Sequence, residues 1–587
     1  MNAGATAANG LWALSCLSGA LAFHRATGAV AHTQERLLRA CLARNADTVF
    51  GRRHGFARIR SVCEYRERVP LSTYEDYRDA VGRIAAGEPG VLTREPVLLL
   101  EPTSGSTEAT KLIPYTARLK TEFQRALAPW VANVYREHPG LLGGQAYWSL
   151  SPVTARDDRV PGGVPIGFDD DAEYLGPVAR RLARSLQAVP AEVRLLSDLE
   201  AFWYATLLFL LRCEHLALVS VWSPTFLTLL LGRLAPWQER LAADVAAGTF
   251  SAPVPVDPAL ARRLSSGARP DPRRADRLRA AFGAGRSPGE FHAALWPSLG
   301  VVSCWADGNS RTYAAALAEL LPQARLQPKG LVATEGIVSF PLPGRSGAAL
   351  AVRSHFFEFL PEGGRGEPRL AHELEAGRTY SVVLTTGGGL YRYRLRDRIE
   401  VVGHFGQCPL LRFLGKEDQV SDWFGEKLDE GHVREVLDAA LARQGLGAAF
   451  ALLACEPGGS PAAYTLFLES PGADQSLLAV ASDLEAALGA NYHYRYCRAL
   501  GQLGPVRVFR VAGGGAEACL RACADAGQRL GDVKPALLSR RGGWSSHFRG
   551  HFVPALPRDR HGRCGAAREG HVREAGPGSR HAGRSPR

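Results

Sequence analysis

The middle of the chain alternates between apolar runs and segments with helical periodicity. Leu216–Val221 is a short apolar run that predicts a buried strand, and the pattern of Ser223–Leu231 predicts a helix directly after it. The same order recurs at Val301–Ser303 and Ser310–Leu321. This alternation is typical of an α/β body with an at least partly parallel sheet.

The N-terminal quarter is predicted to be helical up to about residue 90. Leu11–Phe23 has the length of a signal-peptide core, but no basic segment precedes it, so a buried N-terminal helix pair is the better interpretation. No run approaches the roughly 18–20 apolar residues of a membrane span. Val97–Leu100 then predicts a strand, Thr103–Thr110 a polar loop, and the segment from Ala117 a helix capped by Thr116.

Strands are predicted at shorter spacing beyond residue 345, which indicates a β-rich subdomain. They are Tyr380–Thr385, Leu390–Leu395 and Glu400–Gly403. A smaller α+β lobe is predicted from about Gly415. Its helices are His432–Arg443 and Gln475–Leu488, and its strands are Phe450–Ala454, Tyr464–Leu468 and Val506–Val511. We therefore expect domains at 1–417 and 418–540, followed by a tail at 541–587.

Composition fits a multidomain globular protein. The 587 residues are 46% hydrophobic and 22% charged, with a net charge of +12. From Arg540 to the end there are eleven arginines against three acidic residues, so 11 − 3 = +8 of that charge lies in the tail. The tail is rich in Arg, Gly, His and Pro, and we expect it to be disordered. Nucleic-acid binding through this tail is one alternative function, which deletion of residues 541–587 would test.

The eleven cysteines show no paired spacing of the zinc type. They are interpreted as reduced and mostly buried, which favours a cytoplasmic location.

The strongest local signal is a loop of hydroxyl-bearing residues, Thr103-Ser104-Gly105-Ser106-Thr107, followed by Glu108-Ala109-Thr110-Lys111. Backbone N–H and side-chain O–H donors after a buried strand suit phosphate oxygens, and a nearby lysine offsets their charge. The loop lacks the Walker A pattern. A plain polar connector is the alternative.

With Leu112-Ile113-Pro114-Tyr115-Thr116, this loop resembles the phosphate loop of the acyl-adenylate-forming superfamily. It is most similar to that of the plant auxin-responsive (Gretchen Hagen type) acyl-acid amido synthetases and their bacterial relatives, and we expect the bacterial branch. Three further motifs of that family follow in order. They are Ala333-Thr334-Glu335-Gly336, Gly389-Leu390-Tyr391-Arg392-Tyr393-Arg394-Leu395-Arg396-Asp397, and Gly531-Asp532-Val533-Lys534-Pro535.

The resemblance implies roles for individual residues. Nucleotide contacts are expected from Thr103, Ser104, Gly105, Ser106, Thr107, Thr334, Glu335, Tyr391 and Asp397. Glu335 would hold Mg²⁺, and Asp397 would accept from both ribose hydroxyls. A solvated loop carboxylate and an ion pair with Arg396 or Arg398 are the respective alternatives.

Lys534 and Lys111 are the implied catalytic cations, because an ammonium stabilises the charge that builds on the transferring oxygens. Lys416 and Asp418 belong to a Gly-Lys-Glu-Asp element that resembles the superfamily's hinge, about which a small mobile C-terminal lobe rotates. The chain departs from the family at Arg396, where relatives have Gly, and at Ala109. If that Gly has a positive φ, Arg costs about 1 kcal/mol or more there.

The expected fold is α/β, with a large N-terminal adenylate-forming domain of parallel or mixed sheets and a small α+β lid. The expected enzyme is a ligase that uses ATP and Mg²⁺ to join a small carboxylic acid to an amine such as an amino acid. A ligase that loads a thiol and an inactive family member are the alternatives. Candidate pocket residues are Trp222, Phe226 and Trp305. We expect a monomer, with no nucleic-acid or membrane partner.

Overall fold

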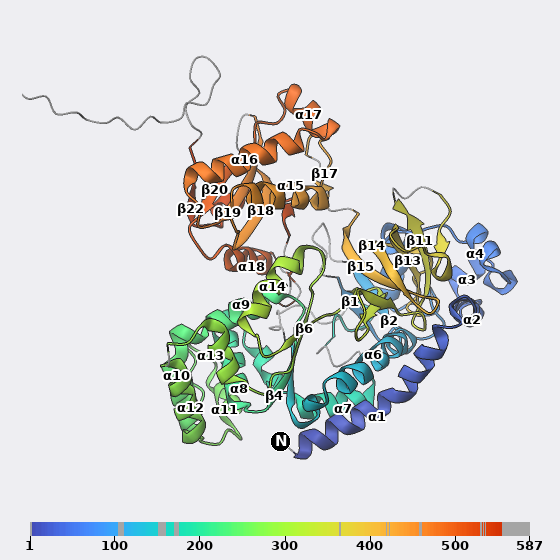
Figure 1. Cartoon of the computed structure of the whole chain (residues 1–587). Coiled ribbons are helices and arrows are strands. Elements are labelled where there is room, and N and C mark those ends of the chain that lie inside the picture. Colours follow the sequence, from blue (N-terminus) through green and yellow to red (C-terminus); the bar gives the residue numbers. More distant parts are fainter. Residues whose placement is uncertain are drawn as a thin grey trace, which may run out of the picture.

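The computed structural model of the chain describes residues 3–103, 111–150, 160–168, 175–283, 285–362, 366–417, 420–421, 423–456, 461–526, 528, 531, 533–534 and 536–554. A large N-terminal lobe carries a smaller C-terminal lobe on one side, drawn in orange and red in Figure 1. The fold class predicted from the sequence, α/β with a second, smaller α/β lobe, is confirmed.

A four-stranded parallel sheet forms the centre of one half of the large lobe. Its order is β3-β4-β5-β6, from Gln145–Trp148, Leu216–Ser220, Val301–Cys304 and Arg325–Pro328. Helices cover it, and they are α8 (Leu199–Arg212), α9 (Pro224–Gly232), α10 (Leu234–Ala247), α11 (Pro258–Ser265), α12 (Pro272–Phe282), α13 (Pro288–Leu295) and α14 (Arg311–Leu320). The strand–helix alternation at β4–α9 and β5–α14 matches the prediction.

The N-terminal helices lie along the other half of this lobe. They are α1 (Ala3–Ala26), α2 (Val30–Arg44), α3 (Val49–Arg53), α4 (Val62–Arg68) and α5 (Arg78–Ala85). One stripe of α1, including Trp12, Cys16 and Phe23, packs into the core shared with α6 (Ala117–Glu137), and α7 (Pro177–Leu186) lies beside it. By length and composition α1 could cross a membrane, a test that the core helix of a soluble protein and a signal sequence also pass.

Strand β1 (Leu99–Pro102) pairs antiparallel with β2 (Leu112–Tyr115) directly ahead of α6. The predicted order of strand, loop and helix is therefore wrong in one respect, because a second strand precedes the helix. The predicted cap is confirmed: the Thr116 hydroxyl accepts from the Leu119 N–H at 3.1 Å. The hairpin presents the candidate phosphate loop at its tip.

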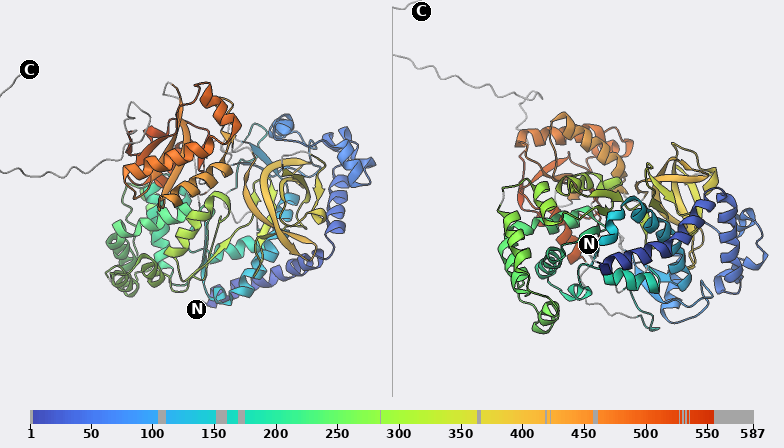
Figure 2. Two further views of the ribbon diagram at one scale, coloured as in Figure 1. Left: turned by 45° about the horizontal axis from the view of Figure 1, so that its top comes forward. Right: turned by 60° about the horizontal axis from the view of Figure 1, so that its bottom comes forward.

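The predicted β-rich subdomain is a seven-stranded antiparallel sheet (Figure 2, yellow). Its order is β12-β11-β13-β14-β15-β10-β9, from Arg369–Leu370, Phe356–Pro361, Thr379–Thr385, Tyr393–Phe405, Cys408–Lys416, Ala348–Leu350 and Ser339–Pro341. The two strands predicted at Leu390–Leu395 and Glu400–Gly403 are one long strand, β14, that begins at Tyr393.

The C-terminal lobe contains a five-stranded mixed sheet of order β21-β18-β19-β20-β22. Its strands are Leu538–Ser539, Phe450–Glu456, Ala463–Glu469, Arg507–Val511 and Gly550–Phe552, and its helices are α15 (Glu430–Arg443), α16 (Asp474–Leu488), α17 (Tyr492–Ala499) and α18 (Gly515–Asp525). Asn491 caps α17, while Tyr494 and Arg498 both bond to Glu485. These three residues therefore have a structural role in the small lobe.

The beginning of the expected disordered tail is folded. Strand β22 pairs with β20, and Trp544, Phe548 and Val553 are buried at 5%, 6% and 7% exposure. The prediction of disorder from residue 541 is therefore wrong for residues 541–554, because apolar side chains there complete the core of the lobe. Residues 555–587 lie outside the described part of the chain.

Candidate active site

Glu335 lies in a two-residue turn between β7 (Val332–Ala333) and β8 (Gly336–Ile337), where the sequence predicted a turn. The side chain is only 9% exposed, and one carboxylate oxygen accepts from the Tyr393 hydroxyl at 3.2 Å. Burial and the Glu335 charge together raise the pKa of Tyr393, so its hydroxyl stays a donor. The Tyr115 hydroxyl donates to the Thr334 carbonyl at 2.5 Å and fixes the other side of the turn.

A buried acid and imidazole hold the same turn from behind. His355 Nε2 accepts from the Ile337 N–H at 3.1 Å, and its Nδ1 lies 3.0 Å from Glu122 Oε2. With Nε2 an acceptor, the proton of the neutral ring is on Nδ1, directed at Glu122. Glu122 also accepts from the Gly387 N–H at 2.8 Å. Sequence reasoning missed this pair, because Glu122 and His355 are 233 positions apart.

Asp397 is buried on β14 at 2% exposure and pairs with Lys416 at 3.0 Å between Oδ1 and Nζ. The two residues face each other across β14 and β15. Arg396, before it, has φ of 60°, so the positive φ expected where relatives have Gly is present. The pairing of β13 with β14 is irregular here, and such bulges re-aim a side chain next to a site. Asp397 therefore makes an ion pair, as the alternative interpretation predicted, but its partner is Lys416 and not Arg396 or Arg398.

The candidate phosphate loop is closed by the Thr103 N–H, which donates to the Lys111 carbonyl at 2.9 Å. Lys111 Nζ lies 5.9 Å from the centroid of the Tyr74 ring. The expected nucleotide contacts at Ser104, Gly105, Ser106 and Thr107, and the departure at Ala109, lie outside the described residues. Thr103 and Lys111 therefore fix only the two ends of the loop.

Aromatic and cationic side chains gather at the carboxyl ends of the parallel strands. Trp222 follows β4 and Trp305 follows β5, with ring centroids 5.8 Å apart. Lys329 follows β6, and its Nζ lies 4.9 Å from the Trp222 ring centroid. In open α/β sheets, ligands bind at this edge. Lys329 was not among the predicted site residues, although its position directly after a strand is a sequence feature that could have identified it.

Lys534 reaches the same strand edge from the C-terminal lobe. Its Nζ lies 5.3 Å from the centroid of the Trp305 ring. The expected catalytic lysine and two expected pocket residues, far apart in sequence, are thus brought together where the lobes meet. Asp307, two residues beyond Trp305, has its pKa raised mainly by burial.

Two candidate residues belong to the core. Tyr391 has 0% exposure, stacks on Phe50 at 4.8 Å and donates its hydroxyl to the Leu92 carbonyl at 2.8 Å. A nucleotide contact through that side chain is therefore a wrong prediction for this structure. Phe226 is 1% exposed inside the core around α8 and α9, so it does not line an open pocket either.

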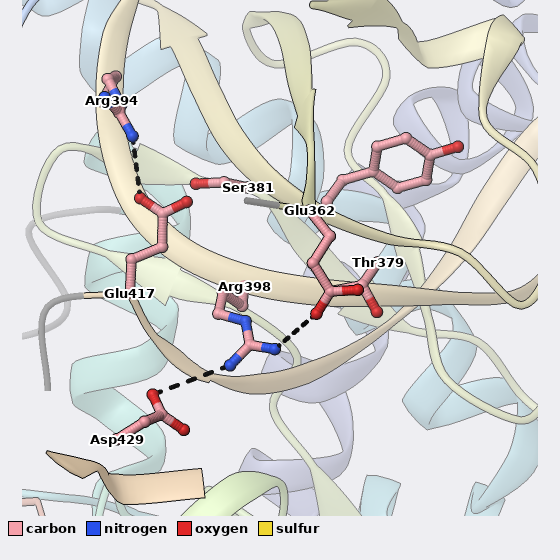
Figure 3. A pocket seen from close by; sticks show the side chains of 8 residues that line it. Glu362, Thr379, Ser381, Arg394, Arg398, Glu417 and Asp429 are labelled. Carbon is pink, nitrogen blue, oxygen red and sulfur yellow. Dashed lines mark hydrogen bonds and ion pairs between the residues drawn. The ribbon is translucent and has the colours of Figure 1, made fainter. Parts of the chain in front are cut away.

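A cavity of about 330 Å³ borders the expected hinge (Figure 3). Arg394 bonds to Glu417 at 3.1 Å, while Arg398 lies 3.0 Å from Glu362 and 4.0 Å from Asp429 of the C-terminal lobe. The ion pairs of β14 therefore reach both the hinge and the small lobe. Lys416 is at the end of β15, and Asp418 lies outside the described residues.

Family models cover most of the chain in three parts. The GH3 family N-terminal domain matches residues 20–326, the central domain 348–416 and the C-terminal domain 432–542. The chain belongs to the GH3 family. It is similar to the indole-3-acetic acid-amido synthetase GH3.3 of Arabidopsis thaliana, with 25% identity over 559 residues. The matched region covers 89% of this chain and 93% of the relative.

Other GH3 proteins match over similar lengths. The probable indole-3-acetic acid-amido synthetase GH3.12 of Oryza sativa subsp. japonica is 25% identical over 562 residues, or 87% of this chain and 92% of the relative. The solved structure of the GH3.15 acyl acid amido synthetase has the same fold, with a TM-score of 0.76 and 20% identity, covering 91% of this chain and 97% of the other. The overall fold is therefore that of a GH3 protein.

The residues present suit the ATP that the family implies and the Mg²⁺ expected from the sequence. Mg²⁺ is usually held by one or two carboxylates together with substrate phosphates, and Glu335 supplies one carboxylate beside the Thr334 turn. No cluster of three or more metal-ligating side chains occurs among the described residues. A single carboxylate such as Glu335 fits a Mg²⁺ ion that is bound together with nucleotide phosphates.

Proposed function

We propose that the protein is an ATP-dependent acyl-acid amido synthetase. In the first half-reaction a carboxylate attacks the α-phosphate of ATP, forming an acyl-adenylate and releasing pyrophosphate. In the second, an amine, which we propose is that of an amino acid, attacks the acyl carbon and AMP leaves. Membership of the GH3 family supports this assignment, and the identities of the acid and the amine stay open.

The approach of Lys534 to Trp305 is the observation that carries the proposal. An ammonium at the carboxyl edge of the parallel sheet is placed to stabilise the charge that develops on the transferring oxygens. Since Lys534 comes from the small lobe, its contribution depends on how the two lobes are docked. Lys111, at the base of the loop on the β1–β2 hairpin, is proposed as a second cation for the phosphates.

Glu335 and Asp397 are proposed to orient the nucleotide. The buried Asp397 carboxylate can accept from both ribose hydroxyls, with its ion pair to Lys416 holding it in place. Glu335 would hold Mg²⁺, which offsets the charge of the phosphates when bound. The Tyr393 hydroxyl donates to Glu335 and sets the direction of its carboxylate.

ATP–pyrophosphate exchange with a panel of small aromatic and aliphatic acids tests the first half-reaction. We expect exchange with at least one acid and a large but incomplete fall of the exchange rate in Lys534→Ala, with ATP binding retained. No exchange with any acid, together with no ATP binding, would contradict the enzyme assignment and favour an inactive family member.

The acids that support exchange are then combined with amino acids and, separately, with coenzyme A. An amide product that forms without coenzyme A supports the synthetase. A thioester product without any amide would identify the alternative, a ligase that loads a thiol.

We further propose that the protein acts as a cytoplasmic monomer and belongs to a bacterial branch of the family. The ten cysteines of the described residues are free thiols, as in a reducing compartment. Light scattering coupled to gel filtration tests the monomer, and a mass of two chains would contradict it. Cell fractionation tests the location.

A further inference from the structure

Charged residues from three helix ends meet where the two lobes touch. Arg233 is the residue at the C-terminal end of α9, Glu200 lies in the first turn of α8, and Glu517 lies in the first turn of α18. Arg233 Nη2 is 2.5 Å from Glu517 Oε1 and 3.3 Å from Glu200 Oε1. Arg521 of α18 lies 2.6 Å from Glu517 and 3.5 Å from Glu200, and we call Glu200, Arg233, Glu517 and Arg521 the Arg233 cluster. Figure 1 shows α18 on the side of the small lobe that faces α9 and α14.

The arrangement of the Arg233 cluster is electrostatically favourable. Glu200 and Glu517 are anions at helix N-termini and complement the local helix dipoles. Arg233 is both the C-cap of α9 and the N-cap of α10, so the effects of these two helix dipoles on it oppose each other, and its favourable partners are the two carboxylates. Arg233 is 23% exposed, Glu517 is 25% exposed, and the guanidinium carbon lies 4.8 Å from the centroid of the buried Trp203 ring. Because these groups are mostly shielded, their pairing is screened less than that of an open surface ion pair.

The helix held by Arg233 also bears on the position of Lys534. Leu520, one turn beyond Glu517 on α18, is 3% exposed and packs in the core cluster of the large lobe. Val533 of the small lobe joins that cluster at 6% exposure, and Lys534 follows it directly. The docking of α18 therefore sets where Val533 enters the large lobe and where the Lys534 ammonium lies relative to Trp305.

We propose that Arg233 is a positioning residue for the adenylation half-reaction. Its pairs with Glu200 and Glu517 hold the small lobe in the orientation that delivers Lys534 to the strand edge. Rotation of the lobe for acyl transfer must break the pair between Arg233 and Glu517, so the cluster biases the enzyme toward adenylation. This inference rests on the proposed function.

The test is Arg233→Met, which keeps an unbranched side chain over Trp203 and removes the charge. We expect kcat for pyrophosphate exchange to fall roughly tenfold, the size of a typical coupling between two conformations. Arg233→Lys should recover part of the rate. Transfer from preformed acyl-adenylate to an amine, measured in a single turnover, should not slow, since that step needs the lobe to leave this orientation.

A control for the loss of an arginine charge is Arg279→Met, which removes more exposed ion pairs inside the large lobe, to Glu239 at 2.9 Å and to Asp276 at 3.6 Å. It should leave exchange unchanged. A second control combines Arg233→Met with Lys534→Ala. If Arg233 acts through Lys534, the residual exchange of Lys534→Ala does not fall further. A tenfold additional loss in the double variant, or an equal loss in Arg279→Met, would overturn the proposal.

Small-angle X-ray scattering of the full chain tests the docking without any reaction. Arg233→Met should enlarge the radius of gyration or broaden the distribution of lobe orientations, while Arg279→Met should match the wild type. If no acid supports exchange and ATP does not bind, but the scattering changes as expected, the proposed function fails and the docking role of Arg233 stands. Identical scattering for wild type and Arg233→Met would contradict the docking role itself.

Discussion

His355 ties the Glu335 turn to the core, and replacing its ring tests how much that attachment stabilises the protein. His355→Phe keeps an aromatic ring between Phe123 and Phe357, whose centroids lie 6.1 and 5.8 Å away. It removes the acceptor of the Ile337 N–H and the donor to Glu122. The fold around the ring is retained while both polar contacts are lost.

The expected loss follows from the two contacts. An orphaned buried N–H costs about 1–3 kcal/mol, and a hydrogen bond to a charged group contributes about 1.5–3 kcal/mol. Glu122 keeps its bonds to the Gly387 N–H and to Arg118, so the loss lies near the lower end of the summed range. We expect the free energy of unfolding of the large lobe to fall by about 3 kcal/mol, with part recovered by His355→Gln, whose amide can donate and accept.

The assay is urea denaturation followed by tryptophan fluorescence, with exchange kinetics measured on the same variants. His404→Phe is the matched control: it removes one bond, 3.0 Å from the ring to the Leu374 carbonyl, in the same lobe. It should cost about 1 kcal/mol and leave exchange intact. A loss below about 0.5 kcal/mol for His355→Phe, or unchanged exchange despite the expected loss, would refute the reasoning, since surface-like changes fall in that range.

Three further predictions follow from burial. Truncation after Pro554 should leave the melting temperature unchanged. Truncation after Arg540 removes the buried Trp544 and should lower the melting temperature, because burying such a side chain contributes about 1.5–3 kcal/mol. Equal melting temperatures for the two truncated chains would contradict this prediction. Burial raises the pKa of Asp307, so ionisation of this carboxyl destabilises the folded protein. The stability of Asp307→Asn relative to wild type should therefore increase as pH rises from below 3.8 to neutral. A stability difference that does not change with pH would exclude this cause. Iodoacetamide should modify exposed Cys63 well before Cys304, whose pKa burial raises to about 12, as mass spectrometry can check; equal rates would contradict it.

Local patterns predicted the parts of the fold that local interactions decide. The strand–helix units at β4–α9 and β5–α14 have short uninterrupted apolar runs followed by clear helical periods, so their existence followed from the sequence. Strand β2 was missed because it has only four residues and includes Pro114, which weakens any strand pattern. Composition misled at the C-terminus, since many arginines obscured the few apolar residues that pack in the small lobe.

The candidate site was predictable only where its residues stand in motifs. Glu335 and Lys534 were found through short sequence patterns, and the structure adds the neighbours that those patterns cannot name. Glu122 supports the Glu335 turn, but in the sequence it cannot be distinguished from any other glutamate of a helix. Its role is visible only in the structure, where His355 lies beside it. Tyr391 shows the reverse error: it stands in a motif, but Arg392 has φ of 49°, and the chain before β14 turns its side chain into the core.

Backbone strain near Asp397 explains how the chain keeps its candidate ribose site while departing from the family motif. A left-handed conformation costs a non-glycine residue about 1–2 kcal/mol, yet Arg396 adopts it. In that conformation its carbonyl accepts from the Glu417 N–H at 2.7 Å, which ties the bulge to the hinge. The next residue, Asp397, is then buried against Lys416. Leu395, Asp397 and Ile399 are all buried, so the side chains of β14 alternate regularly between its two faces through the bulge. The left-handed conformation at Arg396 therefore leaves Asp397 on the buried face, and arginine at 396 costs stability without removing the carboxylate from the site.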